Sequence, residues 1–176
     1  MTEKSLVQRV LTPFGRSAPV VGDRAPLFVA RTHERTSIDL RDFRGRYLVL
    51  YFYPKAFTRG CTAEARAFRD HFAELRALGA TVVGVSPDAE SVQRDFATHH
   101  QLPFPLIADD GAVCRDYAAT RSVLPLTRRL TFVIDPHGRI VARFHHELDV
   151  SRHLEDVLAF LRARPPVNVP DRMHDA

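Results

Sequence analysis

One uninterrupted apolar run, residues 47–53, constrains the fold more than any other stretch of this sequence. Every position in the run is β-branched, aromatic or leucine, so a strand built from it presents apolar side chains on both of its faces. Such strands are typical of sheets that are covered by helices on both sides. Pro54 then ends the strand, because proline has no N–H group for a neighbouring strand. The run therefore predicts the central strand of a layered α/β domain.

A cysteine, Cys61, follows this strand at or near the predicted start of a helix. The helix is indicated by apolar residues at helical spacing with charged residues between them, until Gly79 supplies a stop: Ala65, Phe68, Phe72 and Leu75. The unpaired N–H groups and the positive dipole end of a helix start stabilise an anion, and Arg59 adds a cationic neighbour. A thiolate is the reactive form of cysteine. The sequence thus predicts a reactive Cys61, whereas an isolated cysteine is more often an inert, buried residue.

Two residues of the connecting loop complete a small donor-lined pocket around this cysteine. Thr58 offers a hydroxyl donor to a bound oxygen, and the rigid ring of Pro54 shapes the loop and shields the sulfur. Both residues also fit an ordinary turn, so their weight comes from their spacing to Cys61.

That spacing resembles the active-site signature of a known family. The pattern Pro54-x-x-x-Thr58-x-x-Cys61 after a buried strand is similar to that of the peroxiredoxins, in the AhpC/TSA family. Residues 51–62 resemble the bacterioferritin comigratory protein branch, also called PrxQ, which typically has proline where this chain has Arg59. Further segments match the family in order, so that the resemblance covers roughly residues 21–162: residues 21–26, 42–46, 84–88 and 131–135.

The resemblance implies a thioredoxin-like fold with a mixed central sheet, and a thiol-dependent peroxidase that reduces hydrogen peroxide and organic hydroperoxides. Cys61 is then the peroxidatic cysteine that becomes a sulfenic acid. The family takes a guanidinium from the strand before the closing hairpin, and Arg129 stands at that position. Arg128 is the less favoured substitute, because neighbouring strand residues face opposite ways. No cofactor is implied.

The departures from the family concern the second half of the catalytic cycle. Many members of the branch carry a resolving cysteine five residues after the first, where this chain has Arg66. The other usual resolving position falls near Ala97. Cys114 matches neither position and is expected to be a packing residue, with a redox role as the alternative. We therefore expect a one-cysteine cycle in which a small thiol or a thioredoxin-like protein reduces the sulfenic acid.

Two other functions compete with the peroxidase. A non-enzymatic redox sensor would oxidise Cys61 with negligible turnover and change its binding to a partner. A thioredoxin-type disulfide reductase is disfavoured, because the chain has no Cys-x-x-Cys pair. The histidine pairs 99–100 and 145–146 lack further ligands at metal-site spacing and are read as solvated surface.

Composition limits the setting of this chemistry. A chain of 176 residues with 45% hydrophobic content suits one domain, which we place at residues 21–164 between an arm (1–20) and a tail (165–176) that is rich in proline. Two cysteines make no disulfide framework, and no secretory signal or transmembrane run is evident, so we expect a cytoplasmic protein. The net charge of +4 is interleaved with acidic residues, which disfavours a nucleic-acid partner. Relatives in the branch imply a monomer or a homodimer.

The remaining pattern predicts strands alternating with helices before a closing hairpin and helix. Asp135-Pro136-His137-Gly138 marks the hairpin turn. Ser151 is expected to cap the last helix. The other expected elements are a hairpin of residues 27–30 and 37–40, a helical turn at 40–45, a strand at 81–85, a helix starting at 86–88, a strand at 103–108, a short helix ending at 117, and strands at 130–134 and 139–144.

Overall fold

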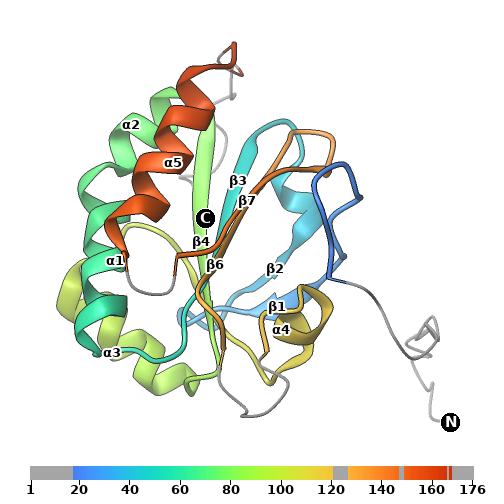
Figure 1. Cartoon of the computed structure of the whole chain (residues 1–176). Coiled ribbons are helices and arrows are strands. Elements are labelled where there is room, and N and C mark those ends of the chain that lie inside the picture. Colours follow the sequence, from blue (N-terminus) through green and yellow to red (C-terminus); the bar gives the residue numbers. More distant parts are fainter. Residues whose placement is uncertain (1–17, 121–126, 147–148, 166, 168–176) are drawn as a thin grey trace, which may run out of the picture.

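The computed structural model describes residues 18–120, 127–146, 149–165 and 167, which form a five-stranded sheet with helices on both faces (Figure 1). The strand order is β5 (Leu106–Ala108), β4 (Ala80–Ser86), β3 (Tyr47–Phe52), β6 (Leu130–Ile134) and β7 (Ile140–Phe144). β3, β4 and β5 are parallel, whereas β6 pairs antiparallel with β3 and with β7. The predicted mixed sheet is confirmed, and the apolar run forms its central strand, buried at every position.

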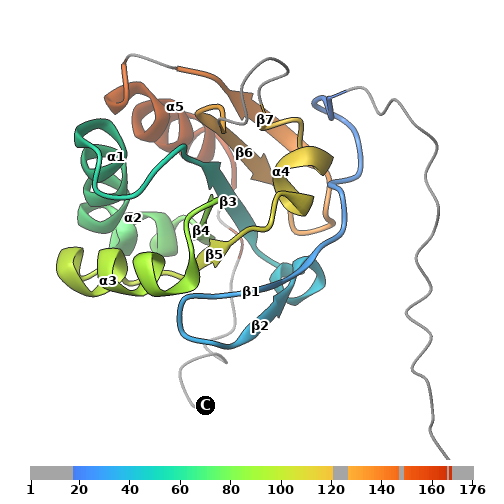
Figure 2. The same ribbon diagram turned by 90° about the horizontal axis from the view of Figure 1, so that it is seen from below.

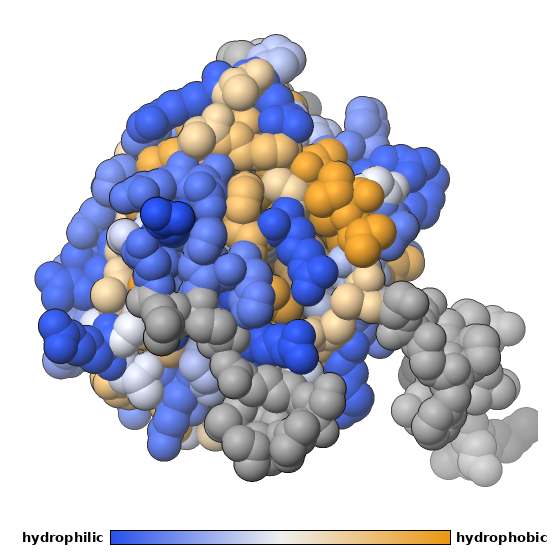
Figure 3. Space-filling model, in the orientation of Figure 1, coloured by the Kyte–Doolittle hydropathy of each residue, from blue (hydrophilic) through white to orange (hydrophobic). Residues whose placement is uncertain are grey.

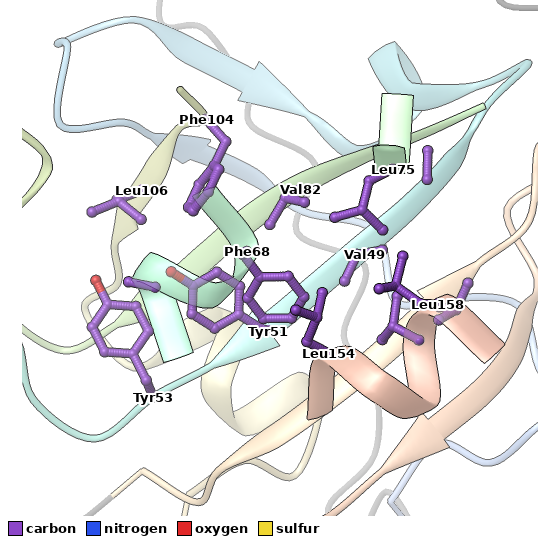
Figure 4. Packing of buried hydrophobic residues seen from close by; sticks show 14 of the residues in the cluster. Val49, Tyr51, Tyr53, Phe68, Leu75, Val82, Phe104, Leu106, Leu154 and Leu158 are labelled. Atoms are coloured by element: carbon purple, nitrogen blue, oxygen red, sulfur yellow. The ribbon is translucent and has the colours of Figure 1, made fainter. Parts of the chain in front are cut away.

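One face of the sheet is covered by the four longer helices, α1 (Arg59–Asp70), α2 (Phe72–Ala77), α3 (Glu90–His100) and α5 (Ser151–Arg162) (Figure 1). Val49 and Tyr51 of β3 point to this side, where the Tyr51 ring centroid lies 4.9 Å from that of Phe68 (Figure 4). Cys61 belongs to the same apolar cluster. This core therefore fixes α1, and with it the cysteine, against the centre of the sheet.

The opposite face is covered by the hairpin of β1 (Val29–Arg31) and β2 (Ser37–Asp39), the single-turn helix η1 (Leu40–Phe43) and the short helix α4 (Ala112–Asp116) (Figure 2). Leu50 and Phe52, which alternate with Val49 and Tyr51 along β3, pack on this side with Cys114. The two cysteines of the chain therefore lie on opposite faces of one sheet.

The pairing of β3 with β6 brings two distant segments together. Phe52, the last residue of β3, pairs with Leu130, the first residue of β6. Because the strands are antiparallel, the loop that follows β3 lies beside the residue that precedes β6. Residues 53–61 and Arg129 are thus neighbours at the same end of two inner strands of the sheet.

Two predicted helices have different limits in the structure. The helix after Cys61 is interrupted at His71 and continues as α2, so that it is two helices. Gly79 follows α2 with a φ of +76°, which confirms the expected glycine stop. The last helix begins at Ser151 itself, whose hydroxyl donates a hydrogen bond to Asp149 Oδ1 at 2.7 Å. Ser151 is therefore the first helical residue, and the prediction that it is the N-cap was wrong.

The helix expected to begin at residues 86–88 begins at Glu90. Ser86 is the last residue of β4, and its hydroxyl donates to Asp88 Oδ2 at 2.6 Å. The same carboxylate oxygen accepts the N–H of Ala56 at 2.7 Å. Asp88 is thus used to tie the loop after β3 to the end of β4, and the helix starts only after this turn.

The other expected elements are confirmed with small differences. The first hairpin starts at Val29 and not at residue 27, and the strand expected at 103–108 is reduced to Leu106–Ala108. Two prolines at positions 103 and 105 explain the shorter strand, since they cannot donate to a ladder. The closing hairpin pairs Ile134 with Ile140 across the predicted turn.

The surface in Figure 3 is largely hydrophilic, with its most hydrophobic patch over the N-terminal segment, where Val20 and Val21 are exposed. Leu27, Val29 and Phe57 are also exposed, and the expected monomer or homodimer stays a prediction. Most of the predicted arm and tail lies outside the described residues, and the domain limits also stay predictions. No helix in the described part of the chain is long and apolar enough to cross a membrane.

Candidate active site

Cys61 is the third residue of α1 and is 1% exposed. It lies in the first helical turn, where backbone N–H groups have no partner within the helix and the helix dipole is positive. The sequence prediction of a cysteine at a helix start is confirmed. The sulfur lies on the inward side of the helix and faces the core.

A guanidinium from the segment before β6 reaches this sulfur. Arg129 immediately precedes β6, is 6% exposed, and donates from Nη2 to Cys61 Sγ at 3.4 Å. Gly60 makes room for it, because a Cβ atom at that position would lie 3.1 Å from Arg129 Nη2. The structure therefore brings together Arg129 and Cys61, as the family resemblance implied. Arg128 has no contact with the sulfur.

A carboxylate that sequence reasoning missed holds the same guanidinium. Glu64, one turn after Cys61, is 1% exposed and accepts a hydrogen bond from Arg129 Nη1 through Oε2. Burial raises the pKa of Glu64 to about 7, although Arg129 opposes the shift. Burial also opposes the charge of Arg129, but Glu64 and Cys61 outweigh it and keep the pKa of the guanidinium above its usual value. Glu64 thus fixes the orientation of Arg129 beside the sulfur.

The signal for Glu64 was present in the sequence. Positions 61, 64, 65 and 68 share the inward side of an amphipathic helix, and a glutamate among cysteine, alanine and phenylalanine there is exceptional. A buried carboxylate requires a charged partner, which points to an arginine.

A buried histidine stands behind this pair. His153 of α5 is fully buried, and its Nδ1 atom lies 3.9 Å from Glu64 Oε1. With a proton on Nε2, the ring donates to the carbonyl of His146 at 2.9 Å and accepts from the Thr131 hydroxyl at 2.8 Å. Burial lowers the pKa of His153 to about 4; the hydrogen bond to the His146 carbonyl opposes this shift, whereas the charges of His146 and Arg129 add to it. The ring is therefore neutral at pH 7, and no sequence pattern indicated it.

Three polar atoms around the sulfur are buried without a hydrogen-bond partner among the described residues: Tyr51 Oη, Glu64 Oε1 and Arg129 Nε. Burial is the main reason why the pKa of the Tyr51 hydroxyl is raised. Tyr53, Glu64 and Cys61 raise it further, whereas Arg129 lowers it. Unpaired buried polar groups are costly and are concentrated at functional sites. The cluster is thus a preorganised polar site within an apolar core.

The loop between β3 and α1 is anchored on both sides. Tyr53 donates its hydroxyl to Gln93 of α3, and the Gln93 amide donates to the carbonyl of Ile107 at 3.1 Å. Pro54 follows and is half-buried. Thr58 is the N-cap residue of α1, but its hydroxyl donates to the carbonyl of Lys55 at 2.9 Å and caps no helix N–H. The roles predicted for Pro54 and Thr58 therefore stay predictions.

The other residues singled out by sequence lie apart from the sulfur. Arg59 and Arg66 are both exposed on the outward side of α1. Ala97 is buried in α3, and Cys114 is on the opposite face of the sheet. Within the described residues, no group of three or more histidine, cysteine or acidic side chains could hold a metal ion.

Comparison with known proteins shows the family to which this chain belongs. The model of the AhpC/TSA family matches residues 21–143. The chain belongs to the AhpC/TSA family. It is 34% identical over 152 residues to peroxiredoxin Bcp of Bacillus subtilis, which covers 81% of this chain and 94% of the relative. The chloroplastic peroxiredoxin Q of Gentiana triflora is 31% identical over 144 residues, and there the chain spans 66% of the relative's length.

A solved structure supports the same assignment. BcpB of Mycobacterium tuberculosis has a TM-score of 0.79 and 33% identity, covering 84% of this chain and 99% of its own. The predictions of a peroxiredoxin of the Bcp or Q branch and of its thioredoxin-like fold are therefore confirmed. Peroxiredoxins are oxidoreductases that reduce peroxides with thiols.

Proposed function

We propose that this peroxiredoxin is a thiol-dependent peroxidase in which Cys61 is the peroxidatic cysteine. The observation that carries the proposal is the contact between Arg129 Nη2 and Cys61 Sγ at 3.4 Å, at the start of a helix. A fixed positive charge and a helix N-terminus both stabilise negative charge that develops beside them. The substrates are hydrogen peroxide and small organic hydroperoxides.

In this mechanism the Cys61 thiolate attacks one oxygen of the hydroperoxide. A sulfur–oxygen bond forms, the oxygen–oxygen bond breaks, and the second oxygen leaves as hydroxide or alkoxide, which takes a proton to give water or an alcohol. Donors aimed at that developing charge lower the barrier. Arg129 and the free N–H groups at the start of α1 supply them, with the Thr58 hydroxyl as a further donor and Pro54 as a shield.

The cycle then depends on an outside thiol. Arg66 occupies the position of the usual resolving cysteine, and Cys114 lies on the far face of the sheet. A small thiol or a thioredoxin-like protein therefore condenses with the sulfenic acid, releasing water, and a second thiol releases Cys61. We place this chemistry in the cytoplasm, with a monomer or homodimer as the working unit and no membrane or nucleic-acid partner.

The first test is the intact mass of the reduced protein after one equivalent of hydrogen peroxide, with a sulfenic-acid trap present and peptide mapping. We expect the trap on Cys61 alone. A loss of two hydrogens mapped to a bond between Cys61 and Cys114 would overturn the one-cysteine cycle. An unmodified Cys61, beside a control peroxiredoxin that reacts, would overturn the peroxidase.

A second measurement separates the enzyme from a redox sensor. Sustained peroxide consumption with excess thiol, at many turnovers per chain, is expected of the enzyme. A single oxidation event followed by no further turnover, with thiols of several kinds, would favour the sensor.

A further inference from the structure

A groove of about 540 Å³ lies along the outward side of α1, next to the end of α3. Its volume falls in the range of small-molecule sites. The residues around it come from the loop and first two turns of α1, and from the last two residues of α3: Phe57, Arg59, Thr62, Ala63, Arg66, His99 and His100. Nothing in the peroxidase mechanism uses this groove.

The groove is built for a negative charge. Arg59 and Arg66 are exposed on it, no acidic residue lines it, and neither arginine is ion-paired with a described residue. The local field is positive enough to act on a neighbour. Burial lowers the pKa of His100, and the charges of His99, Arg66 and Arg69 lower it further.

A strained aromatic residue lines the groove. Phe57 has a φ of +60°, which is rare for a bulky side chain, and it is 50% exposed. Its ring lies 5.1 Å from that of Phe96 and 6.0 Å from that of His100. Strain of this kind persists where the surroundings enforce it and is concentrated at functional sites. An apolar body beside two arginines that have no ion pair within the described part of the chain suits a small organic anion.

The groove is lined by residues that flank the reactive cysteine in the sequence. Arg59 and Thr62 line it, and Cys61 lies between them with its sulfur turned inward. The N-cap residue Thr58 gives the first helical turn no side-chain cap, which makes that turn easier to open. Unwinding of that turn would bring Cys61 toward the groove.

We propose that this groove binds a low-molecular-weight thiol bearing carboxylate groups, as the reductant of the Cys61 sulfenic acid. The proposal rests on the proposed peroxidase function and names the class of its reductant. Arg59 and Arg66 hold the carboxylates. The thiol sulfur attacks the sulfenic sulfur, a disulfide bond forms, the sulfur–oxygen bond breaks, and the leaving hydroxide takes the thiol proton to become water. A second thiol molecule releases Cys61 and leaves as its disulfide.

The kinetic test compares thiols of different charge on the preformed sulfenic acid. Mercaptosuccinate carries two carboxylates, whereas 2-mercaptoethanol is neutral. We expect the Arg59→Gln/Arg66→Gln variant to slow reduction by mercaptosuccinate about 10-fold at low salt, relative to reduction by 2-mercaptoethanol. Dividing the two rates removes any change in the reactivity of Cys61 itself. Equal slowing of both thiols, or of neither, would refute the proposal.

The matched control is Arg115→Gln/Arg139→Gln, which removes the same net charge from residues outside the groove. It is expected to leave the ratio of the two rates within about twofold. A carboxylate-bearing hydroperoxide is tested alongside. If only its reaction is slowed by loss of Arg59 and Arg66, the groove receives the peroxide and not the reductant, and the proposal is wrong.

A binding measurement keeps this inference separate from the peroxidase proposal. S-methyl mercaptosuccinate cannot react, and its binding to the reduced protein is followed by NMR shifts of the Thr62 and Ala63 amides. We expect saturable shifts that weaken about 10-fold in the Arg59→Gln/Arg66→Gln variant. If no sulfenic acid forms but these shifts appear, the peroxidase fails and the anion site stands. If the sulfenic acid forms but no shifts appear, only the groove proposal fails.

Discussion

The two cysteines of this peroxiredoxin are almost equally buried, yet their surroundings are opposite in character. Cys61 and Cys114 are 1% and 2% exposed, and each lies on a helix packed against the same sheet, on opposite faces. Cys61 receives a hydrogen bond from Arg129. Cys114 has the Asp109 carboxylate as its charged neighbour. Burial alone therefore does not decide whether a thiol is reactive, because the sign of the nearest charge differs between the two.

The surroundings of Cys114 suppress ionisation. Burial raises the pKa of its thiol far above the usual value, and the Asp109 carboxylate adds to the shift. The same carboxylate accepts the backbone N–H groups of Val113 and Cys114, at 3.0 and 2.8 Å. Asp109 thus fixes the start of α4 and keeps the thiol neutral, which fits the packing role expected for Cys114.

The largest expected effect comes from removing each sulfur in turn. Cys61→Ser is expected to lower peroxide consumption roughly 1,000-fold or more, because the nucleophile is lost. Cys114→Ser is expected to change it less than about twofold. The measurement is steady-state peroxide consumption with excess thiol. A comparable loss in Cys114→Ser, in protein that is still folded, would remove the distinction between the two cysteines.

The next effect comes from the charge beside Cys61. Arg129→Gln is expected to slow oxidation of Cys61 about 100-fold, since a preorganised donor to the reacting atoms is lost. The control is Arg128→Gln, which removes the same charge one residue earlier and is expected to stay within about threefold of the wild type. Stopped-flow measurement of the first oxidation step compares the variants. Equal rates in the two variants would contradict the assignment of Arg129.

The buried groups on the Cys61 side also predict how stability depends on pH. The pKa of Glu64 is raised from 4.5 to about 7, so the folded chain holds the extra proton in that range and stability falls as the pH rises through it. The pKa of His153 is lowered from 6.5 to about 4, so the unfolded chain holds the extra proton and stability rises with pH there. The two contributions oppose each other between about pH 4.5 and 6.5.

Single variants should separate these contributions. In Glu64→Gln only the His153 contribution remains, so the free energy of unfolding is expected to rise by about 2 kcal/mol as the pH increases from 4 to 6.5. In His153→Asn only the Glu64 contribution remains, and the free energy of unfolding is expected to fall by a similar amount as the pH increases from 4.5 to 7. Urea unfolding at several pH values measures both slopes. Cys114→Ala serves as the control from the other face and should keep the wild-type slope. Parallel slopes in all three variants would show that Glu64 and His153 do not titrate as described.

The smallest effect is expected on the Cys114 side. Asp109→Asn should lower the free energy of unfolding by about 1 kcal/mol, because the amide is a weaker acceptor for the N–H groups at the start of α4. It should also speed alkylation of Cys114 in the native protein while leaving that of Cys61 unchanged. Mass spectrometry after timed iodoacetamide treatment measures both sites. An unchanged rate at Cys114 would mean that burial alone protects it.

The sequence was informative where one local pattern determines one element. The run at 47–53 had no polar position, so only a strand covered on both faces could accommodate it, and Cys61 followed at a helix start. Arg129 was found through the family resemblance, because nothing local connects it to a residue 68 positions away. Its approach depends on the antiparallel pairing of β6 with β3, which is a property of the whole sheet.

What could not be predicted depends on contacts between elements that are distant in sequence. Asp88 delays the start of α3 because its carboxylate accepts the N–H of Ala56. The sequence of residues 86–100 alone cannot predict that hydrogen bond, because Ala56 lies outside it. His153 reaches Glu64 only because α5 packs beside α1. Among the site residues that sequence reasoning missed, Glu64 could have been found locally, from its place on the inward side of an amphipathic helix.

The position of the sheet between the two cysteines also determines how a disulfide in this protein should be interpreted. A disulfide requires Cα atoms within about 7 Å of each other, whereas layers packed on the two sides of a sheet each lie about 10 Å from it. Cys61 and Cys114 are therefore out of each other's reach while the sheet is intact. A disulfide formed by the folded chain is therefore expected to link Cys61 to a different molecule.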